Sequence, residues 1–180
     1  MTNKKPESLL AQIPTKKLPP VHDWNPELNG DMDIRIARNG IWFHEGVAIK
    51  RDKLVRLFST ILRREGDDYY LLTPVEKWRI QVDDAPFIAT LLEVTGVGEA
   101  QSLSMTTNVG DHFLVDAQHP INVEIDPVTE EPSPYILVRD GLNAMISRSI
   151  FYELVNLGVE KSGHIGVYSD KAFFSLGKLD

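Results

Sequence analysis

Cysteine is absent from the 180-residue chain, and so is any apolar run of about 18 residues, the length that spans a membrane as a helix. The first absence excludes disulfides, cysteine-ligated zinc, iron–sulfur clusters and thiol catalysis. The segment Met1–Pro14 begins with lysines like a secretion signal, but its apolar run from 9 to 13 is too short for one. We therefore expect a cytoplasmic protein with no membrane partner.

The short motifs of several enzyme classes are also missing. No phosphate-binding Walker loop, EF-hand loop or Gly-x-Ser-x-Gly elbow occurs, and the five histidines include no pair at the spacing of a helical zinc site. Gly96-Val97-Gly98 resembles the start of a dinucleotide-binding loop, but the third glycine and a following helical pattern are absent, which favours a hairpin turn. We expect no cofactor and no metal, and a binding protein rather than an enzyme.

Acidic residues outnumber basic ones by 26 to 19, which gives a formal charge of −7. An acidic surface disfavours general binding to DNA or RNA, because such binding depends on neutralising phosphates. Hydrophobic residues make up 42% of the chain and charged residues 25%, proportions that are typical of a folded protein. The length fits one large domain or two small ones.

Proline marks the first boundary. Residues 1–29 contain five prolines and few core-forming side chains, so we expect an extended N-terminal arm, with Trp24 as its anchor on the rest of the protein. A short apolar stretch around Leu9 can form one helical turn within the arm. After the arm we predict a first α+β domain at 30–82 and a second, β-rich domain at 83–180.

The first domain combines strand and helix patterns. Apolar and polar residues alternate from Met32, and Asn39-Gly40 is a hairpin signal because both residues tolerate positive φ. Apolar residues at helical spacing predict a helix at 51–64. The predicted strands are 32–37, 41–45, 69–72 and 78–82.

The second domain has the pattern of a mostly antiparallel β structure. The predicted strands are 87–95, 103–107, 112–115 and 121–125. Residues 126–134 are acidic and rich in proline, and proline cannot donate to a central ladder. We therefore predict an exposed loop over 126–134.

A second copy of the first pattern follows this loop. Residues 135–142 mirror 34–41, including the turn. With four residues fewer between the turn and the helix, a helix predicted at 148–159 then matches the helix of the first domain. The alignment places Leu154 opposite Leu57. We interpret this as a strand–turn–strand–helix–strand unit that is used twice, although two common α+β arrangements can coincide by chance. Two packed copies would meet along a seam, where ligand sites are common.

Three polar segments are candidate binding sites. The helix at 51–64 carries Arg56 and Arg63 along one polar stripe, which could bind a phosphate or carboxylate through guanidinium contacts; a solvated helix face is the alternative. The turns at 73–78 and 107–111 are the other two, although turns also use polar residues for their own backbone. The predicted ligand-binding residues are Arg35, Arg56, Arg63, Thr73, Glu76, Lys77, Asn108, Asp111 and Arg139.

Carboxylates support a competing hypothesis. Asp31 and Asp33 lie on one face of a predicted strand, where they could converge on a cation or a proton. Together with Glu76 they would serve a metal-assisted hydrolase, whereas solvated or turn-capping carboxylates are the simpler interpretation. A third hypothesis is a protein-interaction module whose strand edge takes up a peptide.

Seven segments of the sequence resemble one bacterial family, the domain-of-unknown-function family DUF1285. They are 30–42, 54–59, 71–77, 82–87, 107–111, 139–142 and 151–154. The likeness extends from about Pro19 to Leu176, with Asn39 where an aspartate is expected. It implies a two-part fold with repeated motifs, the second part similar to a pleckstrin-homology barrel. It also implies a ligand or partner site at the domain interface and a signalling or regulatory role, and it brings no catalytic activity or cofactor with it.

Together these observations favour a cytoplasmic, non-enzymatic binding or regulatory protein of the α+β class. We expect it to hold a small anionic or polar ligand, or a protein partner, between its two units. The duplicated unit, the basic helix within an acidic chain and the lack of a catalytic constellation motivate this hypothesis.

Overall fold

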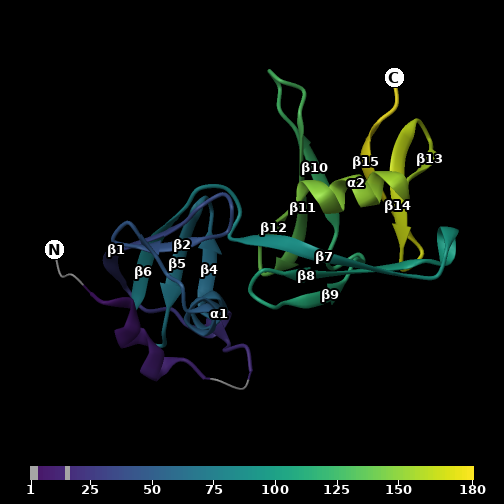
Figure 1. Ribbon diagram of the computed structural model, residues 1–180. Coiled ribbons are helices and arrows are strands. Elements are labelled where there is room, and N and C mark those ends of the chain that lie inside the picture. The colour runs from purple at the N-terminus through teal and green to yellow at the C-terminus, as the bar shows by residue number, and fades with distance from the viewer. Residues whose placement is uncertain (1–3, 15–16) are drawn as a thin grey trace. The chain divides into compact units, whose positions relative to one another are not determined.

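The computed structural model describes residues 4–14 and 17–180, and the chain divides into two compact units, Met1–Asp84 and Ala85–Asp180. The remaining residues of the predicted arm lie outside the described ranges. Both units consist mostly of strands, with one α-helix each, so the α+β class predicted from the sequence is confirmed (Figure 1). Among the helices in the described ranges, none is long and apolar enough to cross a membrane.

The first unit is built around one mixed sheet. Its strands are β1 (Leu28–Ile36), β2 (Trp42–His44), β3 (Val47–Ala48), β4 (Leu62–Glu65), β5 (Asp68–Leu72) and β6 (Lys77–Val82), in the order β3-β2-β1-β6-β5-β4. β1 and β6 pair in parallel at the centre, and the outer pairs are antiparallel. A parallel pair needs a long connection, which here contains helix α1 (Asp52–Thr60) and the β4–β5 hairpin.

Helix α1 packs on the sheet through Trp42 of β2. Its buried residues Leu54 and Phe58 are one turn apart and so lie on one side of the helix. The Phe58 ring stacks on the Trp42 ring with 6.3 Å between the ring centroids, and both side chains are almost fully buried. This aromatic contact positions α1 on β2.

Helix α1 ends at Thr60, whereas the sequence pattern predicted a helix as far as Arg64. The chain from Leu62 to Glu65 forms β4, which pairs antiparallel with β5. Gly66 turns this hairpin with a φ of +61°, a conformation that favours glycine. The longer helix was wrong because pairing with β5 outweighs the local helical preference of the arginines. Arg63 therefore lies on a strand, and the predicted basic stripe on the helix does not form.

The N-terminal arm contains two short 3-10 helices, η1 (Pro6–Gln12) and η2 (Val21–Asp23). Leu9 in η1 is fully buried, which accounts for the helical turn expected there. Val21 forms a buried cluster with two side chains of β5, and Trp24 packs against this cluster. The described part of the arm is therefore helical in part rather than wholly extended, and Trp24 is an anchor.

The second unit combines a curled six-stranded sheet with a three-stranded sheet (Figure 1). The curled sheet contains β7 (Phe87–Thr95), β8 (Ser102–Thr107), β9 (His112–Leu114), β10 (Ile121–Ile125), β11 (Pro132–Arg139) and β12 (Leu142–Ile146), in the order β10-β11-β12-β7-β8-β9. The three-stranded sheet contains β13 (Val159–Lys161), β14 (His164–Ser169) and β15 (Ala172–Lys178). A short 3-10 helix, η3 (Gly98–Ala100), follows β7. Helix α2 (Arg148–Asn156) runs from β12 towards β14 and buries Ile150 and Leu154.

A buried serine joins the two sheets of the second unit. The hydroxyl of Ser169, at the end of β14, donates to the carbonyl of Val115 at 2.6 Å and accepts from the N–H of Leu103 on β8 at 2.9 Å. The Gln101 amide donates to the carbonyl of Tyr168 at 2.9 Å. These bonds hold the end of the three-stranded sheet against β8.

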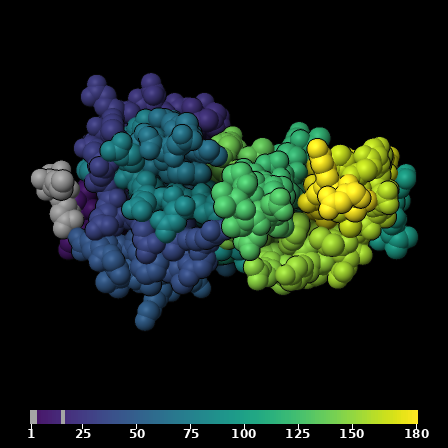
Figure 2. All heavy atoms as spheres, turned by 90° about the horizontal axis from the view of Figure 1, so that it is seen from above, coloured from purple at the N-terminus to yellow at the C-terminus, as the bar shows by residue number. Residues whose placement is uncertain are grey.

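Strand β11 begins at Pro132, inside the segment predicted as a loop. Pro132 and Pro134 pair only with β10, because β12 meets β11 from Tyr135 onward. Proline lacks an N–H donor, so a strand end with a partner on one side tolerates it. The exposed loop is therefore shorter than predicted, and the tip of this hairpin, green in Figure 2, lies on the surface of the second unit.

Both units contain the same order of elements: a strand, a turn, a strand, an α-helix, a hairpin and a last strand, with β3 added in the first unit. The buried helix residues match as well, Leu54 and Phe58 in α1 with Ile150 and Leu154 in α2. This match shifts the alignment predicted from the sequence by one residue, since that alignment placed Leu57 opposite Leu154. The pairing differs, because β6 joins β1 whereas β15 belongs to a separate sheet.

Candidate functional site

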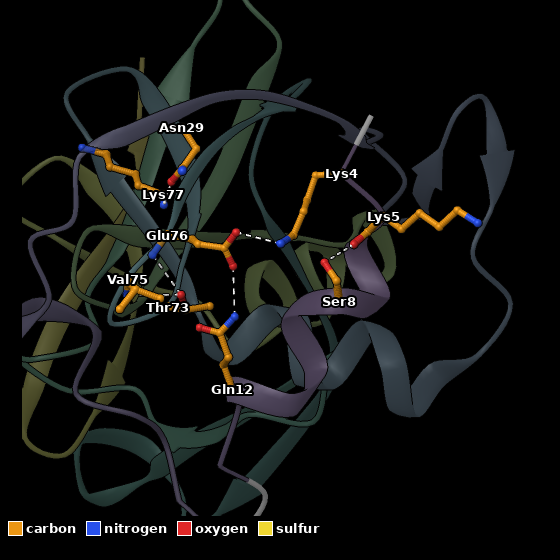
Figure 3. A network of polar contacts seen from close by, with 9 residues as sticks. All are labelled: Lys4, Lys5, Ser8, Gln12, Asn29, Thr73, Val75, Glu76 and Lys77. Carbon is orange, nitrogen blue, oxygen red and sulfur yellow. Dashed lines mark hydrogen bonds and ion pairs between the residues drawn. The ribbon is translucent and has the colours of Figure 1, made fainter. Parts of the chain in front are cut away.

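Three of the predicted residues lie where β5 is joined to β6: Thr73 and Glu76 in the turn, and Lys77 as the first residue of β6 (Figure 3). Thr73 is fully buried, and its hydroxyl accepts hydrogen bonds from the N–H groups of Val75 at 3.4 Å and Glu76 at 3.0 Å. The Thr73 N–H donates to the Glu76 carbonyl at 2.9 Å. Such local bonds lock a turn. Glu76 and Lys77 are therefore presented in fixed directions.

Glu76 binds the N-terminal helix η1. Its carboxylate accepts from the Lys4 ammonium at 2.8 Å and from the Gln12 amide at 2.9 Å (Figure 3). Burial raises the pKa of Glu76, but the hydrogen bonds from Lys4 and Gln12 outweigh burial, and the pKa lies below its ordinary value. The carboxylate is therefore ionised at neutral pH, and it anchors η1.

Lys77 and Arg63 share the carboxylate of Glu65. The Lys77 ammonium donates to it at 2.6 Å, and Arg63 donates to its other oxygen. The hydrogen bond from Lys77, together with that from Arg63, holds the pKa of Glu65 below its ordinary value. Arg63 also donates to the carbonyl oxygens of Val21 at 3.2 Å and Trp24 at 2.5 Å. Arg63 therefore ties the N-terminal arm to β4.

The other two predicted arginines of the first unit lie on different elements. Arg35 on β1 donates to Asp83 at 2.6 Å, and its guanidinium lies 4.7 Å from the centroid of the Phe43 ring. Arg56 is exposed on α1. Arg56 and Arg63 therefore do not share the predicted helix stripe, and Arg35 has its own surroundings on β1.

The three predicted residues of the second unit form hydrogen-bonded contacts around the β8–β9 turn. The side-chain oxygen of Asn108 accepts a hydrogen bond from the backbone N–H of Ile88 at 3.0 Å, and the backbone N–H of Asn108 donates to the Ile88 carbonyl at 2.8 Å. Asp111 pairs with Arg139 at 2.7 Å, and the Arg139 guanidinium lies 5.0 Å from the centroid of the Phe87 ring. These contacts fix the turn to β7 and to the end of β11.

Asp31 and Asp33 line a hollow of about 410 Å³ in the first unit, together with two further aspartates. Arg79 donates to Asp31 at 2.7 and 3.2 Å, and this hydrogen bonding lowers the pKa of Asp31. Glu76 does not line this hollow. Over residues 4–14 and 17–180, no group of three or more histidines and carboxylates is placed to hold a metal ion. The arrangement gives no support to the metal-assisted hydrolase, which stays a prediction.

A groove of about 950 Å³ in the second unit was missed by the sequence analysis. It lies between the β7–β8 connection, the C-terminal end of α2 and β13. Val97 in the connection is 83% exposed, and Val94 and Val159 on the walls are 43% and 41% exposed. The segment 96–98 does connect two antiparallel strands, as predicted. A valine at the tip of a hairpin is the one sequence signal that could have marked a binding surface.

Two family models match consecutive parts of the chain. Residues 19–85 match the N-terminal domain of the domain of unknown function DUF1285, and residues 86–176 match its C-terminal domain. The chain belongs to the DUF1285 family. This confirms the resemblance found in the sequence, and the join between the two DUF1285 matches falls next to the division between the two structural units.

Two crystal structures of DUF1285 family proteins are similar to this chain. The protein from Silicibacter pomeroyi DSS-3 is 48% identical over 97% of this chain and 96% of that chain, with a TM-score of 0.92. The protein from Shewanella baltica OS155 is 28% identical over 70% of this chain and 92% of that chain, with a TM-score of 0.55. No curated protein matches the chain. Function is therefore inferred from the geometry.

Proposed function

We propose that this DUF1285 protein is a binding protein with a regulatory role, and that the groove of its second unit holds a polar ligand or a segment of a partner protein. The main observation that supports the proposal is the groove. Its volume of about 950 Å³ is at the upper end of the range for ligand pockets, which combine mostly apolar walls with a few polar groups. Gln101, Asn156 and Lys161 supply polar groups here.

The predicted arginines support a structural role better than a direct role in binding. Arg35, Arg63 and Arg139 each pair with a carboxylate of their own unit. A guanidinium that already makes a charge-assisted hydrogen bond gains less from an incoming anion. We therefore assign binding to the groove, and we assign to these arginines the task of holding loops and strands in place.

We also infer that the two units descend from one strand–turn–strand–helix unit. The shared order of elements and the matching buried positions of α1 and α2 support this inference. The curled sheet, the three-stranded sheet and α2 likewise support the likeness of the second unit to a pleckstrin-homology barrel.

A thermal-shift screen of the full chain tests the proposed function. Nucleotides, phosphosugars, carboxylates, amines and short basic peptides are added separately, because binding to the native state raises the melting temperature. We expect at least one class to raise it by about 5 °C when its concentration is about a hundredfold above Kd. The rise should disappear in Val159→Asp and persist in Glu130→Lys, a variant of the exposed β10–β11 loop. A screen in which no class changes the melting temperature would refute the proposal.

A further inference from the structure

We propose that the groove takes up an extended segment of a partner protein, which adds as a strand to the free edge of β13. The segment carries apolar side chains at alternate positions and at least one lysine or arginine. This inference rests on the proposed function, because it names the occupant of the same groove.

Strand β13 has one edge to which no other strand of the described chain is hydrogen-bonded. Val159, Glu160 and Lys161 pair with β14 on the other side only, and all three residues are exposed. All three also line the groove. A strand edge with unpaired N–H and C=O groups is a template for a further strand. An extended segment in the groove would satisfy these backbone groups.

A second wall of the groove comes from the end of β7. Strand β12 pairs with β7 only as far as Ala89, although β7 continues to Thr95. No other strand in the described ranges takes the place of β12 beyond that point. Val94 and Gly96 line the groove there. The groove therefore lies between two stretches of extended backbone, which favours an extended occupant.

The walls of the groove are apolar at the positions that such an occupant would touch. Val94, Leu157 and Val159 line it, and both valines are exposed to more than a third of their full area. In an extended chain, alternate side chains point the same way. Apolar residues at every second position of the segment would therefore enter the groove, while the intervening residues face solvent.

The charge of the groove favours a basic segment. Glu99 and Glu160 line it, and so does Asn156 at the C-terminal end of α2, a helix with no basic residue in its last turn. The carbonyl groups at a helix C-terminus carry partial negative charge. Lys161 also lines the groove, with its ammonium 5.1 and 5.3 Å from the centroids of two aromatic rings, and its one positive charge against the two glutamates leaves the lining acidic. A second copy of this chain suits the groove less well, because its net charge is −7.

Panning a displayed library of random peptides of about 12 residues against the full chain tests the proposal. We expect the enriched peptides to share apolar residues at alternate positions and a lysine or arginine. A bound peptide of this kind should slow amide hydrogen exchange at 159–161, which measures strand pairing directly.

Two variants change the groove at exposed positions. Val159→Asp places a charge on the apolar wall, and Glu160→Lys reverses a charge that we expect to attract the peptide. Each should weaken peptide binding, measured by fluorescence anisotropy, by about tenfold or more. Glu130→Lys makes the same charge reversal on the exposed β10–β11 loop and should leave binding unchanged. Circular dichroism and thermal unfolding show whether each variant retains the native fold.

The proposal would be overturned by the absence of any enriched peptide, by peptides that bind both groove variants as tightly as the native chain, or by slowed exchange confined to other strands. A dimer that dissociates in Val159→Asp would also overturn it, since a second copy would then fill the groove. If a small molecule binds in the groove and no peptide does, the partner segment is refuted while the proposed function stands.

Discussion

Glu76 joins two parts of the first unit that are 64 residues apart in the chain, because its carboxylate accepts a hydrogen bond from the side-chain amide of Gln12. Lys4 approaches the same carboxylate at 2.8 Å. The side chain of Glu76 is only 15% exposed, so both contacts are shielded from water and are stronger than contacts on an open surface. The attachment of η1 therefore depends on one negative charge.

We predict that the first unit loses stability in acid partly through Glu76. Folding lowers the pKa of this group from its ordinary value of 4.5, so its contribution to stability is present above that pH and is lost as the pH falls through the folded-state pKa. Glu76→Gln should lower the free energy of unfolding by about 1 kcal/mol at neutral pH. It should also make that free energy less dependent on pH as the pH falls below about 4.5, where the native chain loses this contribution.

Urea unfolding at a series of pH values measures this dependence. Glu27→Gln, which changes an exposed carboxylate of the same unit, is the matched control and should follow the native profile. Parallel profiles for the native chain and Glu76→Gln would show that the anchor is energetically unimportant.

Arg63→Ala should loosen the N-terminal arm. The guanidinium donates to the carbonyl groups of Val21 and Trp24, and its loss removes both bonds at a partly buried site, for about 1–3 kcal/mol. Quenching of tryptophan fluorescence by acrylamide should increase, because Trp24 becomes accessible. Arg56→Ala removes an exposed arginine and should change stability by less than about 0.5 kcal/mol. Equal effects of the two substitutions on stability and quenching would rule out the role of Arg63 in holding the N-terminal arm.

At the scale of secondary-structure elements, the pattern along the chain predicted two strands to the residue. The predicted strands 87–95 and 121–125 have the bounds of β7 and β10. Local patterns were insufficient where a pairing partner decides the conformation. Residues 62–65 pair with β5 instead of continuing the helix, and Pro132 can begin a strand because β11 has a partner on only one side there.

The sequence predicted the candidate binding residues only where their contacts are with residues close to them in the chain. The polar turn at 73–76 is marked by its threonine and proline, and the structure places Thr73 and Glu76 there. The sequence did not show that Glu76 would meet Lys4, since that contact depends on the path of the arm. The groove could not be predicted, because the β7–β8 connection, the end of α2 and β13 meet only in the folded unit.

Gly166→Ala should destabilise the β14–β15 pair. A Cβ atom at this position would lie 2.4 Å from the Phe174 carbonyl oxygen and 2.4 Å from a ring carbon of Phe173. Relief of this overlap needs backbone movement, and we expect a loss of about 1–3 kcal/mol in the free energy of unfolding. Gly177→Ala in β15 is the control, because no atom lies within 4 Å of the added carbon. Thermal unfolding of both variants gives the comparison, and an unchanged melting temperature in Gly166→Ala would disprove the steric argument.

At the scale of the whole molecule, each unit carries its own sheets and its own buried residues. Trp42 and Phe58 centre the first core, whereas Phe87, Met105 and Leu154 are buried in the second. The two DUF1285 matches also divide the chain between residues 85 and 86. Each unit therefore has its own hydrophobic core, which a compact domain needs in order to fold by itself.

We predict that the fragment 86–180 folds without the first unit and keeps the groove. All residues that line the groove belong to this fragment. Its amide resonances should be dispersed, and any ligand or peptide that binds the full chain should bind the fragment with a similar Kd. A fragment with the narrow spectrum of an unfolded chain would show that the second unit depends on the first.

The buried hydroxyl of Ser169 has a mechanical consequence for the second unit. It contacts the backbone of β8 at Leu103 and the chain at Val115, while β14, which ends at Ser169, pairs with β13 along the groove. Because these bonds join the end of β14 to β8 and to Val115, a movement of β13 that carried β14 with it would strain them.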